Sequence, residues 1–336
     1  MKWLAFDIGG ANLKVADGER FAFVEPFPLW EKPRQLVDAL RAMIAMVPDV
    51  DHLAATMTGE LADCFATKTE GVEFIVQAFS KAADKRHTRV YLTNGTLVSP
   101  QIALKQPLLA AASNWHALAQ FAGRSAKKGS GLLIDIGSTT TDFIPLSDGQ
   151  PVTVGKTDPN RLINGELIYS GVERSPVCAI TNIVPWRARQ CPVAQEVFAT
   201  AWDVYLTLGD LPEEPASLHT ADRRGATKQA ARDRLARQIC ADRTMFSDSD
   251  AHTMADAIAR AQAAKIAAFG KYVLSRLPSP PTTVVISGRG EFLARRVIEQ
   301  LGLTAKVVSL SAELGPDLSR AATAHAVAVL AREGPR

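Results

Sequence analysis

A short motif that occurs twice constrains the fold of this chain more than any other feature. The copies read FDIGGANLKVADG, beginning at residue 6, and IDIGSTTTDFIPLSDG, beginning at residue 134. Each copy opens on an apolar strand, turns at Asp-Ile-Gly (Asp7 and Asp135) and continues into a second strand. The two copies lie a full domain length apart, so we interpret them as an internal duplication and not as a short solenoid repeat.

Strands and helices are predicted to alternate after each copy of the motif. After the first copy we predict strands at 21–24, 52–57 and 90–93, helices at 36–47 and 72–84, and an apolar-faced segment at 102–121. After the second copy we predict helices at 194–208, 226–241, 251–277 and from residue 291, and strands at 283–287 and 306–310. Alternating strands and helices are typical of an α/β fold.

The polar stretch at 123–131 has the composition of an exposed linker between domains. We therefore place a first lobe at 1–125 and a second lobe at 126–336. A closing helix is expected at 317–332, and it is expected to pack back on the first lobe. Two duplicated α/β lobes would then flank a central cleft.

The composition is that of a water-soluble globular protein, with 47% hydrophobic and 22% charged residues among 336. The net charge of +3 gives no reason to expect a nucleic-acid partner. No apolar run approaches the ~18 to 20 residues that cross a bilayer, so we expect a cytoplasmic protein without a membrane partner. The four cysteines form no C-x-x-C pair and the six histidines lack metal-ligand spacing. The oligomeric state is left open.

Both Asp-Ile-Gly turns have the residues that a phosphate site needs. Glycines let backbone N–H groups approach an anion, and a carboxylate holds Mg²⁺ through retained waters. One such turn is usually an ordinary hairpin turn, but two copies on equivalent halves indicate loops facing one crevice. We predict Asp7, Asp135 and Asp142 at a metal site, with turn capping as the alternative for Asp142. The predicted phosphate-binding residues of the two loops are Gly9, Gly10, Asn12, Gly137, Ser138, Thr139 and Thr140.

These paired motifs, with Val284-Val-Ile-Ser-Gly-Arg-Gly-Glu291, resemble the phosphate and adenosine segments of the actin-like, sugar-kinase and Hsp70 ATPase superfold. The resemblance implies two ribonuclease-H-like lobes around a cleft. Within the superfold, the stretches TMTGELADCF and NGELIYSGVERSPV resemble the hydantoinase/oxoprolinase-like branch linked to tetrahydromethanopterin-dependent one-carbon metabolism. Archaeal members of that branch are methanofuran-biosynthesis synthases, which join an aminomethylfuran diphosphate to the phenol of γ-glutamyltyramine and release diphosphate.

Two positions depart from the pattern of the superfold. Ala11 stands where sugar kinases often have Thr, and Arg289 stands where an adenine pocket commonly has a small residue. The planar fork of Arg289 suits a phosphate or a carboxylate, so Gly288, Arg289 and Gly290 are predicted to bind phosphate. Both departures favour a Mg²⁺-bound substrate diphosphate over ATP, and ATP stays open as an alternative cofactor.

Residues at strand ends supply the candidates for chemistry, because α/β sheets place ligands at the carboxyl ends of their strands. Lys14 is expected to face phosphate, with a solvated strand residue as the alternative. Glu60 and Asp63 are candidates to accept a proton from a substrate hydroxyl or to bind a substrate ammonium. A structural turn or a helix N-cap is the alternative for Asp63. Asn94 is a substrate-binding candidate. The predicted catalytic residues are Asp7, Lys14, Glu60 and Asp135.

The segment 164–174 concentrates three further substrate candidates, Glu166, Tyr169 and Arg174. Tyr169 would stack on a ring and Arg174 would clamp diphosphate or a glutamyl carboxylate; a helix capped by glycine is the alternative for this segment. The stretch 223–237 holds six basic residues and one acid, which usually marks a solvated helix face. Asp222 and Lys228 lie in a family-like block and are predicted to contact the anionic substrate.

Three functions are compatible with these observations. The first is a Mg²⁺-dependent transferase that couples the furan diphosphate to the phenol of γ-glutamyltyramine or a close analogue. The second is an ATP-dependent small-molecule kinase or hydantoinase/oxoprolinase-like hydrolase that uses the same cleft. The third is a nucleotide-binding scaffold, for which the sequence offers neither a peptide-binding domain nor a helix-turn-helix.

Overall fold

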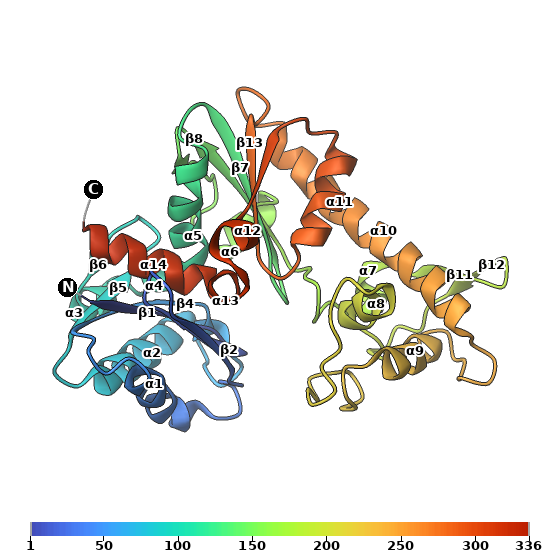
Figure 1. The fold of residues 1–336 in the computed structure, drawn as a ribbon, viewed down its shortest axis with the longest axis horizontal. Helices are drawn as coiled ribbons and strands as arrows, with labels where there is room; N and C mark the ends of the chain where they lie inside the picture. Colours follow the sequence, from blue (N-terminus) through green and yellow to red (C-terminus); the bar gives the residue numbers. More distant parts are fainter. Residues whose placement is uncertain (1, 335–336) are drawn as a thin grey trace.

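The computed structural model describes residues 2–334 and shows two lobes, each built around a mixed β-sheet (Figure 1). The first sheet has the strand order β3-β2-β1-β4-β5-β6. The second has the order β10-β8-β7-β13-β14, with β9 beside β8. In both sheets an antiparallel meander of three strands is extended by two parallel strands. This shared order is that of a ribonuclease-H-like lobe, and it confirms the predicted duplicated α/β fold.

The first sheet is covered by helices on both faces. Its strands are β1 Trp3–Ile8, β2 Asn12–Ala16, β3 Ala22–Pro26, β4 His52–Met57, β5 His87–Tyr91 and β6 Leu97–Val98. Helices α1 Leu36–Ala45 and α2 Lys68–Ala83 cover one face, and α14 Ala322–Glu333 covers the other. Successive residues of a strand point to opposite faces. Leu4, Phe6 and Ile8 therefore pack towards α1 and α2, whereas Ala5 and Asp7 face α14.

The second sheet is covered in the same way. Its strands are β7 Ser130–Ile136, β8 Thr141–Ser147, β9 Gln150–Pro151, β10 Leu167–Ile168, β13 Thr283–Ser287 and β14 Lys306–Ser309. Helix α5 Asn114–Ala122 lies on one face, where Trp115 and Leu118 pack with Leu133 and Ile144. Helices α10 Asp248–Leu274 and α11 Glu291–Leu301 lie on the other.

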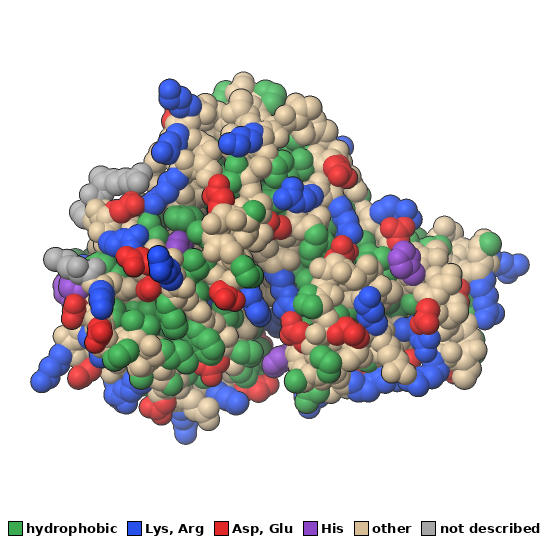
Figure 2. Space-filling model, in the orientation of Figure 1, with side chains coloured by type: hydrophobic (Ala, Val, Ile, Leu, Met, Phe, Trp, Pro, Cys, Tyr) green, Lys and Arg blue, Asp and Glu red, His purple; other side chains and the backbone are tan. Residues whose placement is uncertain are grey.

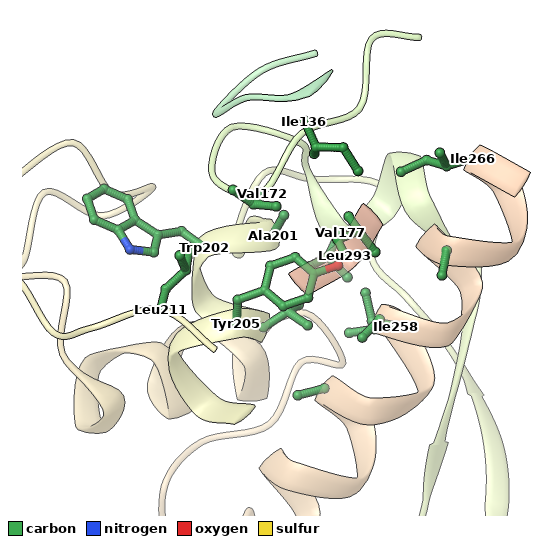
Figure 3. Packing of buried hydrophobic residues seen from close by; sticks show 14 of the residues in the cluster. Ile136, Val172, Val177, Ala201, Trp202, Tyr205, Leu211, Ile258, Ile266 and Leu293 are labelled. Atoms are coloured by element: carbon green, nitrogen blue, oxygen red, sulfur yellow. The ribbon is translucent and has the colours of Figure 1, made fainter. Parts of the chain in front are cut away.

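An outer part of the second lobe extends from its sheet along the long helix α10 (Figure 1). It contains α7 Val177–Ile180, the ribbon β11 Ile183–Trp186 and β12 Arg189–Pro192, α8 Ala201–Leu208 and α9 Lys228–Arg237. Capping boxes begin α8 at Thr200 and α10 at Ser247, and Gly209 ends α8 in the left-handed conformation. Figure 3 shows that this part shares its core with the sheet, because Ile136 and Val172 point into the same cluster as Val177, Tyr205 and Leu293.

Short helices connect these layers. They are α3 Pro100–Leu104, α4 Pro107–Ala110, α6 Asp158–Ile163, α12 Leu310–Leu314 and α13 Pro316–Arg320, with the 3₁₀ turns Pro33–Gln35, Gly59–Leu61 and Gly123–Ser125. The apolar segment predicted at 102–121 is thus three helices, because Pro107 begins a new helix and Ala112 has a positive φ of 46°.

Two helices cross between the lobes. Helix α5 follows the first sheet in the chain but packs on the second sheet, and α14 follows the second sheet but packs on the first. The two helices also contact each other. Small side chains such as Ala328 and Ala331 let α14 approach Ala5 and Ala54 closely. The lobes therefore share one crossed-helix layer.

The stretch 123–131 is packed more tightly than the exposed linker predicted from its composition. Gly123 lies against Gly149, and a Cβ added to Gly123 would lie 1.9 Å from the Gly149 carbonyl oxygen. Residues 130–131 already belong to β7. The polar composition therefore marks a surface turn that is anchored to the second sheet.

Gly71 provides a test of the packing beside the first sheet. An added Cβ would lie 2.3 Å from the Glu60 carbonyl oxygen, so Gly71→Ala is expected to lower the free energy of unfolding by roughly 1–3 kcal/mol. The sign is diagnostic, because Ala normally stabilises a helix interior relative to Gly by about 1 kcal/mol. Urea unfolding followed by circular dichroism measures the change.

Gly10→Ala is the matched control, because its Cβ would meet nothing within 4 Å. Its free energy of unfolding is expected to stay within ~0.5 kcal/mol of that of the wild type. A Gly71→Ala protein as stable as the wild type would contradict the close contact between α2 and the residue 60 turn.

Candidate active site between the two lobes

The two Asp-Ile-Gly turns have the same backbone geometry in the two lobes. The N–H of Gly9 donates to the carbonyl of Asn12 at 3.0 Å, and the N–H of Gly137 donates to the carbonyl of Thr140 at 2.9 Å. Each turn ends the central strand of its sheet. Figure 2 shows the surface hollowed between the first lobe and the outer part of the second, with Lys and Arg side chains deep in the hollow.

Asp7 is almost completely buried at the end of β1. Its Oδ2 accepts a hydrogen bond of 2.5 Å from the Thr323 hydroxyl and lies 3.3 Å from Lys14 Nζ. Lys14 reaches this position because it pairs with Asp7 in the register of β1 and β2. Within residues 2–334, the buried Oδ1 of Asp7 has no hydrogen-bond partner. A desolvated carboxylate oxygen without a partner suits a cation.

Asp135 lies in the same electrostatic neighbourhood although it belongs to the other lobe. Burial raises its pKa to about 6, with a further increase from the charge of Asp142. Lys14 of the first lobe lowers this pKa, and Asp7 of the first lobe raises it. The charges of Asp7 and Lys14 in the first lobe therefore act on Asp135 in the second.

Close backbone contacts hold the second turn in place. The N–H groups of Val172 and Arg174 donate to the carbonyls of Gly137 and Ser138 at 3.0 and 2.9 Å. Gly171 packs directly against the turn, since a Cβ added to it would lie 2.5 Å from the Thr139 nitrogen. Residues 164–171 form a turn and the short strand β10, and not a helix capped by Gly171.

The first turn is held by the chain that follows β3 and by the turn after β4. The N–H groups of Phe27 and Leu29 donate to the carbonyls of Ala11 and Gly10, both at 2.9 Å. Gly59 packs on the same turn, and its Cβ would lie 3.1 Å from the Ile8 carbonyl oxygen. Gly288 has the equivalent position in the second lobe, with a φ of 87° and a Cβ position 2.3 Å from the Ile136 carbonyl oxygen.

Glu60 lies in the turn after β4, beside the first phosphate loop, because β4 pairs in parallel with β1. Its side chain is buried, and among the described residues its Oε2 has no hydrogen-bond partner. Burial, with a smaller contribution from the charge of Asp158, raises its pKa to about 7. Asp158 belongs to the second lobe and forms an ion pair with Lys68 of the first. Glu60 is thus a buried acid that gains and loses a proton near neutral pH.

Asp63 and Asn94 lie at the surface. Asp63 is exposed and lies in a turn, which agrees with the alternative of a structural turn; the N-cap of α2 is Thr67 and not Asp63. The Oδ1 of Asn94 accepts hydrogen bonds from the N–H and hydroxyl of Thr96 at 3.1 and 2.7 Å. Its side-chain oxygen stabilises the turn between β5 and β6, which differs from the predicted substrate contact.

Two predicted ligands in the second lobe are structural acids. Asp142 accepts a hydrogen bond of 2.7 Å from the buried Arg161, whose guanidinium also lies over Trp115. This ion pair replaces the predicted metal contact of Asp142. Glu166 accepts hydrogen bonds from the N–H groups of residues 154 and 155 at 2.8 and 2.9 Å, one on each oxygen. Its carboxylate therefore holds a turn and is not available to a substrate.

The predicted substrate residues of the outer part belong to a charge network. Asp222 pairs with Arg224, Arg234 and Arg237. Burial alone would raise the pKa of Asp222, but hydrogen bonds from Arg224 and Arg234 outweigh it and lower the pKa to about 2. Arg234 is fully buried and also pairs with Asp203, so the stretch 223–237 is only partly the solvated face predicted. Asp222 consequently has a structural role in place of the predicted substrate contact.

The remaining predicted residues have different surroundings. Arg289 is held at 2.8 Å from Glu173 and 2.5 Å from Glu214, and its guanidinium lies over Trp202. The two carboxylates already pair with the guanidinium that was predicted to bind phosphate. Lys228, at the start of α9, is exposed. Tyr169 is also exposed, with 63% of the residue accessible.

Thr323 was not singled out in the sequence, and the supporting roles of Gly59 and Gly171 were not predicted, although Gly288 was predicted to bind phosphate. Gly59 and Gly171 had a visible signal, since each is a glycine beside a predicted strand or loop. Thr323 had none, because only the crossing of α14 onto the first sheet brings it to Asp7.

Two ribonuclease-H-like lobes that turn paired Asp-Ile-Gly loops into one cleft define the actin-like ATPase superfold. A family model described as Hydantoinase/oxoprolinase matches residues 51–330. The chain therefore belongs to the hydantoinase/oxoprolinase family, which confirms the resemblance read from its motifs.

Two relatives and one solved structure extend this assignment. The chain is 34% identical over 330 residues to a protein of Methanocaldococcus jannaschii named (4-{4-[2-(gamma-L-glutamylamino)ethyl]phenoxymethyl}furan-2-yl)methanamine synthase, covering 97% of this chain and 96% of that one. A protein of the same name from Methanococcus vannielii is 29% identical over 201 residues, covering 59% of this chain and 89% of that one. A PilM-PilN type IV pilus biogenesis complex shares the fold, with a TM-score of 0.50, 10% identity and 98% coverage of each chain. The synthase names agree with the prediction of an enzyme.

No helix within residues 2–334 is both long enough and apolar enough to cross a bilayer.

The buried Glu60 carboxyl is expected to make stability depend on pH. A carboxyl whose pKa is raised from 4.5 to about 7 on folding contributes stability that is lost as pH rises through 7. Glu60→Gln cannot ionise, so its advantage in unfolding free energy over the wild type is expected to grow by about 2–3 kcal/mol between pH 5 and pH 8. Urea unfolding at both pH values measures the difference.

Asp63→Asn is the control, because it removes an exposed carboxyl from the same turn. Its difference from the wild type is expected to be the same at both pH values. A Glu60→Gln difference that does not widen between pH 5 and pH 8 would contradict a buried, proton-exchanging Glu60.

Proposed function

We propose that this enzyme joins an aminomethylfuran diphosphate to the phenol of γ-glutamyltyramine, or of a close analogue, and releases diphosphate. The observation that carries the proposal is the 34% identity, over 97% of the chain, to a synthase of that type. The printed name of that relative describes a phenoxymethyl furan that bears a methanamine and a γ-glutamylaminoethyl group. The bond that unites the two halves of such a product is an ether between a phenolic oxygen and a furanylmethyl carbon.

The reaction exchanges one carbon–oxygen bond for another. The bond between the furanylmethyl carbon and diphosphate breaks, and its electron pair leaves with the diphosphate oxygen. The phenolic oxygen forms the new bond to that carbon and gives up its proton. The furan ring shares the positive charge that develops on the carbon, so the protein has to orient the reactants and neutralise the leaving group.

The two phosphate loops and Lys14 fit the leaving diphosphate. Backbone N–H groups of the glycine turns and a cation at the cleft floor stabilise developing negative charge. The position of Lys14 suits this role, because its ammonium group contacts Asp7 and its charge lowers the pKa of Asp135.

A magnesium ion fits the same floor. Mg²⁺ at phosphate sites is commonly bound through one or two carboxylates together with substrate oxygens, and the partnerless Oδ1 of Asp7 is such a group. Asp7 and Asp135 are the residues that would hold it. When bound, the ion would neutralise charge on the diphosphate.

Glu60 is the proposed base for the phenol proton. Its buried carboxyl has a pKa of about 7 and, among the described residues, an oxygen without a hydrogen-bond partner, and it belongs to the turn that packs on the first loop. A base is most effective when its pKa lies near the working pH. Burial therefore tunes Glu60 for proton transfer in the cytoplasm, where we place the enzyme.

The surroundings of Arg289 favour a substrate diphosphate over ATP. Residues 284–291 resemble the adenosine segment of the superfold, and here Arg289, Glu173, Glu214 and Trp202 pack together beside that segment. An ion-paired cluster at this place disfavours a purine. The alternative of an ATP-dependent kinase or hydrolase requires this cluster to open.

Incubation of the purified protein with both substrates and Mg²⁺, without ATP, tests the function. The ether product and diphosphate are expected in equal amounts by mass spectrometry and a diphosphate assay. Turnover that requires ATP and releases ADP would favour the kinase or hydrolase. Absence of the ether under both conditions would reject the proposal.

Glu60→Gln is expected to lower kcat roughly 10²- to 10⁴-fold, because the amide cannot accept the phenol proton. In the wild type, kcat/KM is expected to fall as pH drops below about 7, where Glu60 becomes protonated. Initial rates between pH 5.5 and 8.5 measure both effects. Asp63→Asn should keep the wild-type profile, and a Glu60→Gln protein with the same acidic limb would contradict the assignment of the base.

A further inference from the structure

Trp30 is an exposed aromatic residue on a segment that is otherwise anchored. Its neighbours Phe27 and Leu29 are buried in the core of the first lobe, whereas Trp30 is 37% accessible. The N–H of Leu29 donates to the Gly10 carbonyl at 2.9 Å, and the Leu29 side chain packs on Gly59. Trp30 is therefore fixed beside the first phosphate loop by the residue that precedes it.

Arg174 has the corresponding place on the second phosphate loop. Its N–H donates to the carbonyl of Ser138 at 2.9 Å, while its side chain is exposed. No carboxylate among residues 2–334 forms an ion pair with its guanidinium. The guanidinium carbon instead lies 5.7 Å from the centre of the Trp30 ring. This contact spans the cleft and joins the two phosphate loops.

We propose that the indole face of Trp30 is the binding surface for the ring that carries the diphosphate, and that Arg174 covers this face until the substrate arrives. This inference rests on the proposed function for its catalytic part. On substrate binding the ring takes the place of the guanidinium, and Arg174 turns to the diphosphate. Trp30 is then a catalytic residue that no sequence motif indicates.

The chemistry of the reaction matches what the indole face already holds. A guanidinium is a planar cation with delocalised charge, and the face of Trp binds cations better than that of Tyr or Phe. As the carbon–oxygen bond to diphosphate breaks, the furanylmethyl group becomes a planar cation with charge shared by the ring. Trp30 is expected to stabilise this transition state more than the neutral ring of the ground state.

Position on the chain supports the same pairing. The ring of the substrate is one methylene group away from the diphosphate that the two loops bind. Trp30 directly follows Leu29, whose backbone N–H is hydrogen-bonded to the first loop. A diphosphate held at the loops therefore delivers its ring to the side chain carried by the neighbouring residue.

Substitution of Trp30 tests the catalytic part by the split between kcat and binding. Trp30→Leu is expected to lower kcat roughly 10- to 30-fold, and Trp30→Phe by a smaller factor. Inhibition by inorganic diphosphate, which lacks a ring, should be unchanged in both. Trp186→Leu is the matched control, because Arg187 lies over Trp186 at 4.6 Å in the outer ribbon, and it should keep wild-type kcat.

A kcat of Trp30→Leu within twofold of the wild type would overturn the inference. So would an equal loss in Trp186→Leu, or a loss of diphosphate inhibition as large as the loss of kcat, which would mean a damaged phosphate loop.

A binding measurement decides the ring surface even if the wild type forms no ether. Calorimetry compares methylenediphosphonate with benzyl methylenediphosphonate, a non-reacting probe that carries a ring. The wild type is expected to bind the benzyl probe more tightly, by roughly 3- to 10-fold, and Trp30→Leu should abolish that advantage. An advantage retained in Trp30→Leu, or absent from the wild type, would reject Trp30 as the ring surface, whereas a missing ether product would reject only the proposed reaction.

Discussion

The arrangement of the whole molecule depends on bringing two carboxylates and one ammonium group together at the bottom of a cleft. Asp7 and Asp135 come from different lobes. Lys14 contacts Asp7, and the charges of Lys14 and Asp7 both affect the pKa of Asp135. Like charges in a desolvated place are unfavourable unless cations compensate them. Lys14 compensates in part, and the partnerless oxygen of Asp7 leaves room for a further positive charge. This charge balance supports the proposal that the site receives a cation together with an anionic substrate.

The rigidity of this site comes from backbone contacts more than from side chains. Each phosphate loop is closed by one hydrogen bond across its turn and is supported by a neighbouring segment. Glycines at 59, 171 and 288 allow these segments to approach within distances that a side chain would forbid. Few groups of the site then need to move during the proposed reaction. Arg174 and Trp30, carried by the segments that support the two loops, are exposed groups that contact each other.

The sequence predicted the fold well because the duplicated motif and the alternation of strands and helices are local patterns. Asp7, Lys14 and Asp135 could be proposed for the same reason, and Glu60 because it follows a strand; their catalytic roles stay predictions. Several predicted ligands have other partners in the structure, and these cases concern ion pairing and hydrogen bonding. Asp142, Glu166 and Asp222 are acids in suggestive motifs, but their partners Arg161, the turn at 154–155 and Arg234 are set by tertiary packing. No periodicity or spacing signals which charged groups will neutralise each other, and the same holds for Arg289.

The hydrogen bond from Thr323 to Asp7 joins residues 316 positions apart in the chain. A ribosome makes Thr323 long after Asp7, so the first sheet emerges long before the helix that covers it. The growing chain therefore carries an uncovered apolar face, lined by Ala5 and Ala54, until α14 has been made. Synthesis of α14, and not merely of the first lobe, completes the surroundings of Asp7.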